Sequence, residues 1–326
     1  MTKKRVLVTG GVGYVGSVLV RELLKNGYSV RSFDIVKPEE RFLEDFYKYR
    51  NLDFMKGDIK ETADLEKSVR DVDYVVHLAA IVGDPACAKQ PELAKQTNWD
   101  GSKLLFDICN KTQNIKRFIF ASTCSNYGKM SGSGYVNEGS TLNPVSLYAQ
   151  LKVGFEKYIL AEKTRGDFVP VILRFATAFE VSPRTRFDLT VNEFVKDSYM
   201  GKKLVVFGEK FWRPYCHVQD LTNACIRMLE ADQELIEKDM FNVGDTQENY
   251  QKQTIVELIK KHIPELKVEF VHKDEDPRDY RVNFDKINKT LGFKITKTVN
   301  DGVEELITFL ESRVVKDPDD AIYRNV

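Results

Sequence analysis

The stretch Leu7–Gly16, LVTGGVGYVG, decides the fold, because it places four glycines within seven residues directly after an apolar run. Residues 5–8 are predicted to form a short buried strand, residues 17–26 carry apolar side chains at helical spacing, and residues 28–35 are predicted to form a second strand. The glycines therefore lie at the strand-to-helix turn of a βαβ unit. In that position a glycine-rich turn indicates close approach of a ligand to the backbone, which an isolated glycine turn does not.

Two glycine patterns fit this turn: Gly11, Gly13 and Gly16 match G-x-G-x-x-G, and Gly10, Gly13 and Gly16 match G-x-x-G-x-x-G. Either pattern gives a tight turn and room for a pyrophosphate at the helix N-terminus, where free N–H groups favour anions. Asp34 ends the second strand about twenty residues on, where a carboxylate binds adenosine ribose hydroxyls and repels a 2′-phosphate. The sequence therefore predicts dinucleotide binding, with NAD favoured over NADP.

Composition excludes several other classes of protein. The 326 residues carry 49 basic and 49 acidic side chains, so no charge excess indicates nucleic acid or an anionic membrane as a partner. No apolar run approaches the ~20 residues that span a bilayer, and we expect no signal peptide. Five scattered cysteines and four scattered histidines make a metal site unexpected and suggest a reducing, cytoplasmic location.

Strand and helix patterns alternate through the first half of the chain. Further strands are predicted at 52–56, 74–78, 118–121 and 169–174, and further helices at 62–69, 92–112 and 147–162. Continuously apolar strands between helices indicate a doubly wound parallel α/β sheet, whose ligands bind beyond the carboxyl ends of the strands. After Phe175 the loops lengthen, although 215–230 and 240–243 are expected to rejoin the first domain.

Tyr148 and Lys152 stand four residues apart in the helix predicted at 147–162, so they share one face. A tyrosine titrates near ~10, and a phenolate at neutral pH costs about 4 kcal/mol. A fixed ammonium, together with oxidised nicotinamide, can supply much of that. Thr123, just after the fifth strand, can hydrogen-bond the reacting oxygen; alternatively its hydroxyl only caps a turn.

The chain resembles the extended short-chain dehydrogenase/reductase family, in its NAD-dependent nucleotide-sugar epimerase/dehydratase group, over essentially its full length. The motifs that carry the resemblance are TGGVGYVG (9–16), Asp34, Gly57-Asp58, HLAA (77–80), TNWDGS (97–102), ASTCSNYG (121–128), YAQLK (148–152), LRFATAF (173–179), RPYCHVQD (213–220) and FNVGD (241–245). The resemblance implies a Rossmann-type NAD-binding domain at 1–178, rejoined by about 213–247. A smaller substrate-binding domain would then comprise 179–212 and 248–326.

The resemblance also implies roles for individual residues. Tyr148 would be the catalytic acid/base, Lys152 its tuner and a nicotinamide-ribose ligand, Thr123 the hydroxyl that orients the sugar, and Asn98 a structural helix residue. The cofactor-binding set comprises Gly10, Gly13, Tyr14, Val15, Gly16, Asp34, Asp58, Ile59, Leu78, Ala79, Ala80, Tyr148 and Lys152. The substrate-binding set comprises Thr123, Cys124, Ser125, Asn192, Arg213 and Arg278. The arginines suit a diphosphate, although either can be an ordinary surface charge.

The reaction is less closely defined than the fold. In 4,6-dehydratases of the family an Asp and a Glu follow the Ser/Thr, whereas here Cys124 and Ser125 follow Thr123. Cys124 is either a small packing residue or a proton donor. Asp84, and Glu180 in place of a family Tyr-Gly-Pro-like run, are carboxylates that can act as a base. Arginines in 182–188 can meet an acidic sugar or merely solvate a loop.

We therefore expect epimerisation of a nucleotide-diphosphate sugar, at C4 through a keto intermediate, with dehydration or keto-sugar reduction or dehydrogenation as the alternative. A dinucleotide-binding regulator without catalysis is a third reading, which the presence of Tyr148 and Lys152 disfavours. The resemblance further implies a homodimer formed through the helices expected at 92–112 and 147–162.

Overall fold

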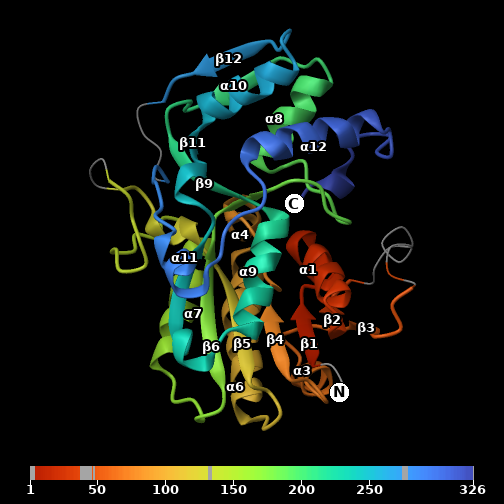
Figure 1. The fold of residues 1–326 in the computed structure, drawn as a ribbon, viewed down its shortest axis with the longest axis vertical. Helices are drawn as coiled ribbons and strands as arrows, with labels where there is room; N and C mark the ends of the chain where they lie inside the picture. Colours follow the sequence, from red (N-terminus) through yellow and green to blue (C-terminus); the bar gives the residue numbers. More distant parts are fainter. Residues whose placement is uncertain (1–3, 37–45, 47, 131–133, 274–277, 326) are drawn as a thin grey trace. The chain divides into compact units, whose positions relative to one another are not determined.

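The structure is a computed structural model that describes residues 4–36, 46, 48–130, 134–273 and 278–325. Its central feature is a seven-stranded sheet in the order β3-β2-β1-β4-β5-β6-β10 (Figure 1). The strands are β1 (Arg5–Thr9), β2 (Ser29–Asp34), β3 (Leu52–Lys56), β4 (Tyr74–His77), β5 (Arg117–Thr123), β6 (Val169–Phe175) and β10 (Asp239–Val243). The pairs β3–β2, β2–β1, β1–β4 and β4–β5 are parallel. The predicted doubly wound α/β fold is therefore confirmed.

Helices connect these strands as the alternating pattern predicts. They are α1 (Tyr14–Lys25), α3 (Thr62–Ser68), α4 (Asp84–Lys89), α5 (Pro91–Lys95), η1 (Gln96–Gly101), α6 (Ser102–Lys111), η2 (Cys124–Tyr127), α7 (Leu147–Ala161) and α9 (Val218–Glu230). Apolar residues of the strands and helices, among them Phe118, Phe120, Phe106 and Phe155, are fully buried in one core. Aromatic contacts such as Phe120–Phe155, with centroids 4.7 Å apart, join α7 to the sheet.

The helix predicted at 92–112 forms in three parts rather than one. α5 continues into η1, a π-helical segment, and then into α6. Within η1, Asn98 donates from Nδ2 to the Ile81 carbonyl oxygen (2.9 Å), and its Oδ1 accepts from the Ile81 N–H (2.8 Å). The amide therefore serves the backbone after β4, as expected for a structural residue, and the π segment is what turns it toward that loop.

The remaining elements, apart from η3, which lies in unit 1, belong to a second unit with its own core. They are β7 (Thr177–Phe179), α8 (Thr190–Tyr199), β8 (Leu204–Phe207), β9 (Trp212–His217), η3 (Gln233–Leu235), η4 (Thr246–Glu248), β11 (Asn249–Gln251), α10 (Lys252–His262), β12 (Val268–Val271), α11 (Asp285–Leu291), α12 (Val299–Glu311) and η5 (Ala321–Tyr323). Strands β11, β9 and β7 form one small sheet, and β12 and β8 form another. Apolar side chains of α8, α10 and α12 are buried together in this core.

The chain divides into two compact units. Unit 1 comprises Met1–Thr123, Ser146–Arg174 and Thr222–Phe241, and unit 2 comprises Cys124–Val145, Phe175–Leu221 and Asn242–Val326. Most of α9 belongs to unit 1, whereas β9 pairs within unit 2. The domain bounds expected from the sequence describe cofactor and substrate binding, which compactness does not test, so they stay a prediction.

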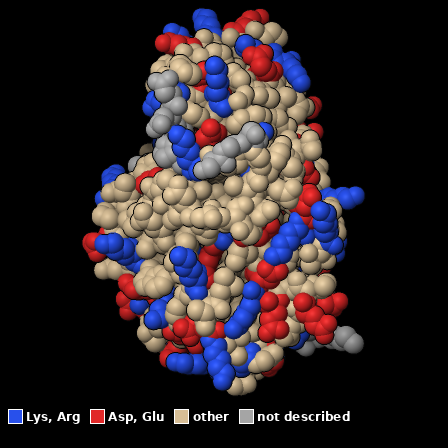
Figure 2. All heavy atoms as spheres, turned by 90° about the vertical axis from the view of Figure 1, so that its left-hand side faces the viewer, with Lys and Arg blue, Asp and Glu red and all other residues tan. Residues whose placement is uncertain are grey.

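Basic and acidic side chains are interspersed on the face that Figure 2 shows, with uncharged surface between them. Among the described residues, no helix has the length and apolar character needed to cross a membrane.

Candidate active site

The glycine turn lies at the point where the strand order of the sheet reverses, between β1 and β4. Gly10 has φ +73°, and a Cβ there would lie 2.8 Å from the backbone nitrogen of Ala79, just beyond β4. A Cβ on Gly16 would overlap the Gly10 carbonyl oxygen. Glycine is therefore required at both positions by close packing within the protein, whether or not a ligand binds. This packing brings the start of α1 against the two central strands.

Helix α1 begins after Gly13, and no side chain caps its first turn. This fits the diphosphate of a dinucleotide, because an uncapped helix N-terminus offers N–H donors and partial positive charge. Asp34, at the end of β2, accepts from the Val12 N–H (3.0 Å) and from the Val36 N–H (3.3 Å). These bonds orient the Asp34 carboxylate at the glycine turn, where ribose hydroxyls of a dinucleotide are expected.

The other residues expected to bind the cofactor lie along the same sheet edge or start α1. Asp58 accepts from the Lys60 N–H (3.0 Å) and pairs with the Lys60 ammonium (3.4 Å), while remaining partly exposed. Ala79 donates its N–H to Thr9 Oγ1 (3.3 Å). Tyr14 and Val15 form the first turn of α1, Ile59 is buried, and Leu78 and Ala80 follow β4. Their contacts with a cofactor stay a prediction.

Tyr148 and Lys152 lie on one face of α7, as the spacing predicts. The Lys152 ammonium nitrogen is 5.8 Å from the centroid of the Tyr148 ring and 4.6 Å from that of Phe120. It donates to the Ala121 carbonyl oxygen (2.7 Å), two residues before Thr123 at the end of β5. The three residues expected to be catalytic are thereby gathered where α7 meets the carboxyl end of β5, all within unit 1.

Burial controls the charge of this lysine. Lys152 is only 4% exposed, and the loss of solvent lowers its pKa to about 8, against the opposing effect of Cys87 and Glu156. At neutral pH the ammonium form still predominates. A cation that is buried beside a tyrosine ring is the arrangement that stabilises a phenolate.

Four of the residues expected to bind substrate meet around Tyr280 in unit 2. The Arg213 guanidinium lies 5.4 Å from the Tyr280 ring centroid, and the Tyr280 hydroxyl donates to Ser125 Oγ (3.5 Å). Arg278 and Cys124 also act electrostatically on Tyr280, whose pKa burial raises to about 12. The cluster combines two guanidinium groups with hydroxyls, a donor set that suits a phosphate-bearing ligand.

Asn192, which is expected to bind substrate, uses its side-chain amide for hydrogen bonds to the backbone. It is fully buried in α8, accepts from the Glu180 N–H (2.8 Å), and donates to the carbonyl oxygens of Glu180 (3.0 Å) and Arg186 (2.8 Å). Its amide therefore holds the loop that follows β7. This geometry favours a positioning role, and direct contact with substrate stays a prediction.

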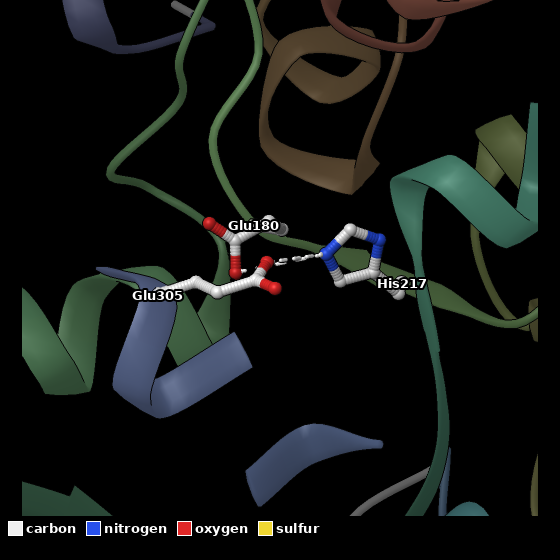
Figure 3. Close-up of side chains that lie close together, drawn as sticks. All are labelled: Glu180, His217 and Glu305. Carbon is white, nitrogen blue, oxygen red and sulfur yellow. Dashed lines mark hydrogen bonds and ion pairs between the residues drawn. The ribbon is translucent and has the colours of Figure 1, made fainter. Parts of the chain in front are cut away.

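A second polar cluster, again in unit 2, contains the buried Glu180 and His217 and the partly exposed Glu305 (Figure 3). His217 Nε2 is 3.2 Å from Glu305 Oε2 and 3.8 Å from Glu180 Oε2. Glu180 is 4% exposed and has φ +99°, a left-handed backbone conformation that residues other than glycine rarely adopt. Burial, together with a smaller contribution from the nearby Glu305 carboxylate, raises the pKa of Glu180 to about 8.

The hydrogen bonds of His217 identify what this cluster can hold. Nδ1 accepts from the Gln219 N–H (3.0 Å), so the ring proton of neutral His217 lies on Nε2. Burial lowers the pKa of His217, which keeps the ring neutral near pH 7. A cation would need the Nε2 lone pair, which that proton occupies. The chemistry therefore favours a proton-sharing cluster over a metal site.

Sequence reasoning missed Tyr280 in the arginine cluster and Glu156 on α7. Tyr280, only two positions after Arg278, is the centre of the arginine cluster. Glu156 extends the Tyr148–Lys152 stripe by one further turn and pairs with Arg174. The spacing of the stripe was a readable signal, whereas the position of Tyr280 depends on a tertiary contact. Asp84 begins α4 and acts on Cys87, which in turn lies near Lys152.

Comparisons with known proteins agree with this geometry. Residues 6–244 match the NAD dependent epimerase/dehydratase family. The chain is 30% identical over 277 residues to a UDP-glucose 4-epimerase of Lactobacillus helveticus (79% of this chain, 81% of that protein). It is 26% identical to a UDP-N-acetyl-alpha-D-glucosaminuronate decarboxylase of Bacillus cytotoxicus (94% and 97%). The solved UDP-glucuronic acid 4-epimerase of Bacillus cereus, in complex with UDP-glucuronic acid and NAD, superimposes with a TM-score of 0.83 at 26% identity (94% and 99%).

The fold therefore defines an extended short-chain dehydrogenase/reductase with a Rossmann-type sheet, as the sequence motifs indicate. The chain belongs to the NAD dependent epimerase/dehydratase family. The expectation of NAD as the cofactor is confirmed at the level of this family.

Proposed function

We propose that the protein is an NAD-dependent epimerase of a nucleotide-diphosphate sugar, acting at C4 through a keto intermediate. The observation that carries the proposal is the Tyr148–Lys152 pair, with a buried ammonium 5.8 Å from the tyrosine ring at the end of β5. Membership of the family and the likeness to 4-epimerases support the substrate class and the reaction.

In this proposal the residues of unit 1 manage the proton. The Lys152 ammonium stabilises the phenolate form of Tyr148, which takes the proton of the sugar hydroxyl and later returns it. Thr123 donates a hydrogen bond to the same sugar oxygen. NAD, when bound at the glycine turn and Asp34, supplies the hydride acceptor for the sugar carbon and the donor for the return step.

Residues of unit 2 hold the nucleotide sugar in this proposal. Arg213 and Arg278 bind the diphosphate, since guanidinium groups offer several N–H donors to phosphate oxygens. Tyr280 and Ser125 supply hydroxyls beside them, and Asn192 acts indirectly by holding the loop at Glu180. Because these contacts hold the nucleotide part, the sugar ring itself can turn over after oxidation and present either face to the cofactor.

Dehydration is the second candidate reaction, and the family includes it by name. Against it stands the sequence at the end of β5, where Cys124 and Ser125 occupy the positions at which a dehydratase carries an acid pair. Cys124 is 1% exposed, which favours a packing role over a proton donor. Keto-sugar reduction and a regulator without catalysis are further alternatives. We also propose a cytoplasmic homodimer, formed through α5–α6 and α7.

The deciding experiment is mass spectrometry of a panel of nucleotide sugars after incubation with the purified protein. A product of unchanged mass and new retention time supports epimerisation. Loss of one water would replace that proposal with dehydration, and a change of two hydrogens would replace it with net redox chemistry. No conversion of any panel member by protein that binds NAD would favour a regulatory role.

The assignment of Tyr148 has its own test. Tyr148→Phe removes the acid/base, so we expect at least a hundredfold loss of kcat while NAD remains bound. The matched control is Tyr158→Phe on the same helix, which removes a hydrogen bond to Asp107 and leaves the Tyr148–Lys152 pair in place. Equal kcat in Tyr148→Phe and wild type would refute the role.

A further inference from the structure

Helix α7 presents three functional side chains as one stripe. Tyr148, Lys152 and Glu156 are spaced by four residues each, so all three face the sheet from successive turns. Glu156 is 2% exposed and accepts from Arg174 on β6, with Nε 3.0 Å from Oε1 and Nη2 2.6 Å from Oε2. Oε1 also accepts from Ser122 Oγ on β5 (2.5 Å). One carboxylate therefore ties the helix to two neighbouring strands.

The Glu156–Ser122 hydrogen bond lies beside the expected catalytic residues on β5. Ser122 lies between Ala121, whose carbonyl oxygen accepts from the Lys152 ammonium, and Thr123. Three consecutive residues of β5 therefore contribute the lysine acceptor, the Glu156 donor and the expected substrate-orienting hydroxyl. A slide of α7 along β5 would alter all three relations together.

Stability alone does not account for this ion pair. Apolar packing holds α7 on the sheet, but it is not directional, and a buried ion pair is often no more stable than apolar residues of the same volume. A bidentate guanidinium–carboxylate pair, by contrast, fixes both distance and orientation. The Glu156–Arg174 pair thus adds a directional constraint that the aromatic contacts of α7 do not supply.

Several charged or titratable groups surround Lys152. They are Glu156 and Tyr148 on α7, Cys87 on α4 and His77 on β4, with Arg174 of β6 beyond Glu156. His77 is buried and its pKa is lowered to about 3, so it is neutral. Burial raises the pKa of the Cys87 thiol, so that group is neutral as well at pH 7. With Cys87 and His77 neutral, Glu156 supplies the negative charge that raises the pKa of Lys152 at pH 7.

We propose that Glu156, held by Arg174 and Ser122, is a positioning residue that fixes Lys152 beside Tyr148 and keeps its ammonium charged. The catalytic meaning of that position rests on the proposed function. The placement and charge of Lys152 do not rest on the proposed function, because they follow from contacts within unit 1.

Glu156→Gln tests the charge, because it keeps the size of the side chain and removes the carboxylate. The first readout is the titration of Lys152 in apo protein by NMR of ¹³C-labelled lysine, assigned by comparison with Lys152→Arg. We expect the pKa of Lys152 to fall by about one unit, since an opposite charge is lost and Arg174 loses its partner. The second readout is kcat against pH, whose alkaline limb should move to lower pH by a similar amount with KM unchanged.

A second variant keeps the proposal falsifiable if Glu156→Gln folds poorly. Glu156→Leu combined with Arg174→Leu removes both charges together and should fold, because paired replacement of a buried ion pair is often tolerated. Without the directional bonds we expect kcat to fall about tenfold while the thermal midpoint stays close to wild type. Tyr158→Phe is the control for a lost hydrogen bond on α7 and should change neither readout.

The outcomes separate the two proposals. An unchanged Lys152 titration in Glu156→Gln, or wild-type kcat in the double variant, would overturn the positioning role. If the wild type converts no nucleotide sugar, the proposed function fails, and the NMR titration still decides whether Glu156 controls Lys152.

Discussion

The two units each bury a glutamate, and they treat its charge differently. In unit 1, Glu156 meets the guanidinium of Arg174 through two bonds, and both side chains are 2% exposed. In unit 2, Glu180 lies beside a second carboxylate, Glu305, and a neutral His217, while the Lys297 ammonium pairs with Glu305. One glutamate is neutralised by a fixed cation, and the other has burial and a like charge acting against its ionisation.

The difference shows how a buried acid can serve two purposes. A bidentate pair fixes the distance and orientation of its two side chains, which suits a helix that must present catalytic groups. An acid whose pKa is raised to about 8 changes charge close to physiological pH, so its surroundings respond to protons. We therefore expect unit 1 to lose stability when a partner is removed, and unit 2 to lose stability when the pH rises.

The largest effect is expected from Arg174→Leu. It leaves the Glu156 carboxylate buried without its cation, which costs about 3–5 kcal/mol of unfolding free energy. Denaturant titration near pH 7 measures this loss. Addition of Glu156→Leu to the variant should recover most of it, and a double variant as unstable as Arg174→Leu would show that the cost is due to packing.

A smaller effect on stability is expected at Glu180, where the cost comes from ionisation of the buried acid and not from loss of a partner. Its folded pKa lies above its unfolded value of 4.5, so the folded state holds the proton more tightly, and stability falls as pH rises through about 8. Between about pH 6 and pH 9 this group should cost the wild type about 2–3 kcal/mol. Glu180→Gln should equal wild type near pH 6 and exceed it at pH 9. Parallel pH profiles of the two proteins would contradict the prediction.

The smallest effects are expected from the neighbours of Glu180. Glu305→Gln removes a like charge and should move the pH at which stability falls downward, whereas Lys297→Met removes a cation and should move it upward, each by less than about one unit. The same pH series of unfolding measurements gives both midpoints. Shifts of the same sign in both variants would mean that packing, not charge, sets the midpoint.

Much of unit 1 was predictable because its determinants are local. Buried parallel strands appear as short apolar runs, and β3 was predicted at residues 52–56, where it occurs. Once the parallel strands are predicted, their carboxyl ends indicate where the ligand site lies. By contrast, α4 was missed because it is only six residues long. The short strands of unit 2 were missed because their pairing partners lie far away in the sequence.

The same reasoning applies to the candidate site. Tyr148 and Lys152 are four residues apart, so helical periodicity alone places them together. The grouping of Ser125 and Arg213 around Tyr280 joins segments more than sixty residues apart and could not be derived from spacing. Asn192 shows a different limit of sequence reasoning. Its position in a motif marks it as a candidate site residue, but does not show whether its amide faces a ligand or its own loop.

The π-helical turn η1 has a consequence for variation in this part of the chain. A π segment holds one residue more than the α-helical turn it replaces, so the buried face of α6 is rotated by about 100° from the course that α5 would have set. Loss of one residue from 96–101 would give a regular helix that turns Asn98 away from Ile81. Insertions and deletions of a single residue should therefore be selected against here more strongly than most substitutions, although the helix itself would tolerate them.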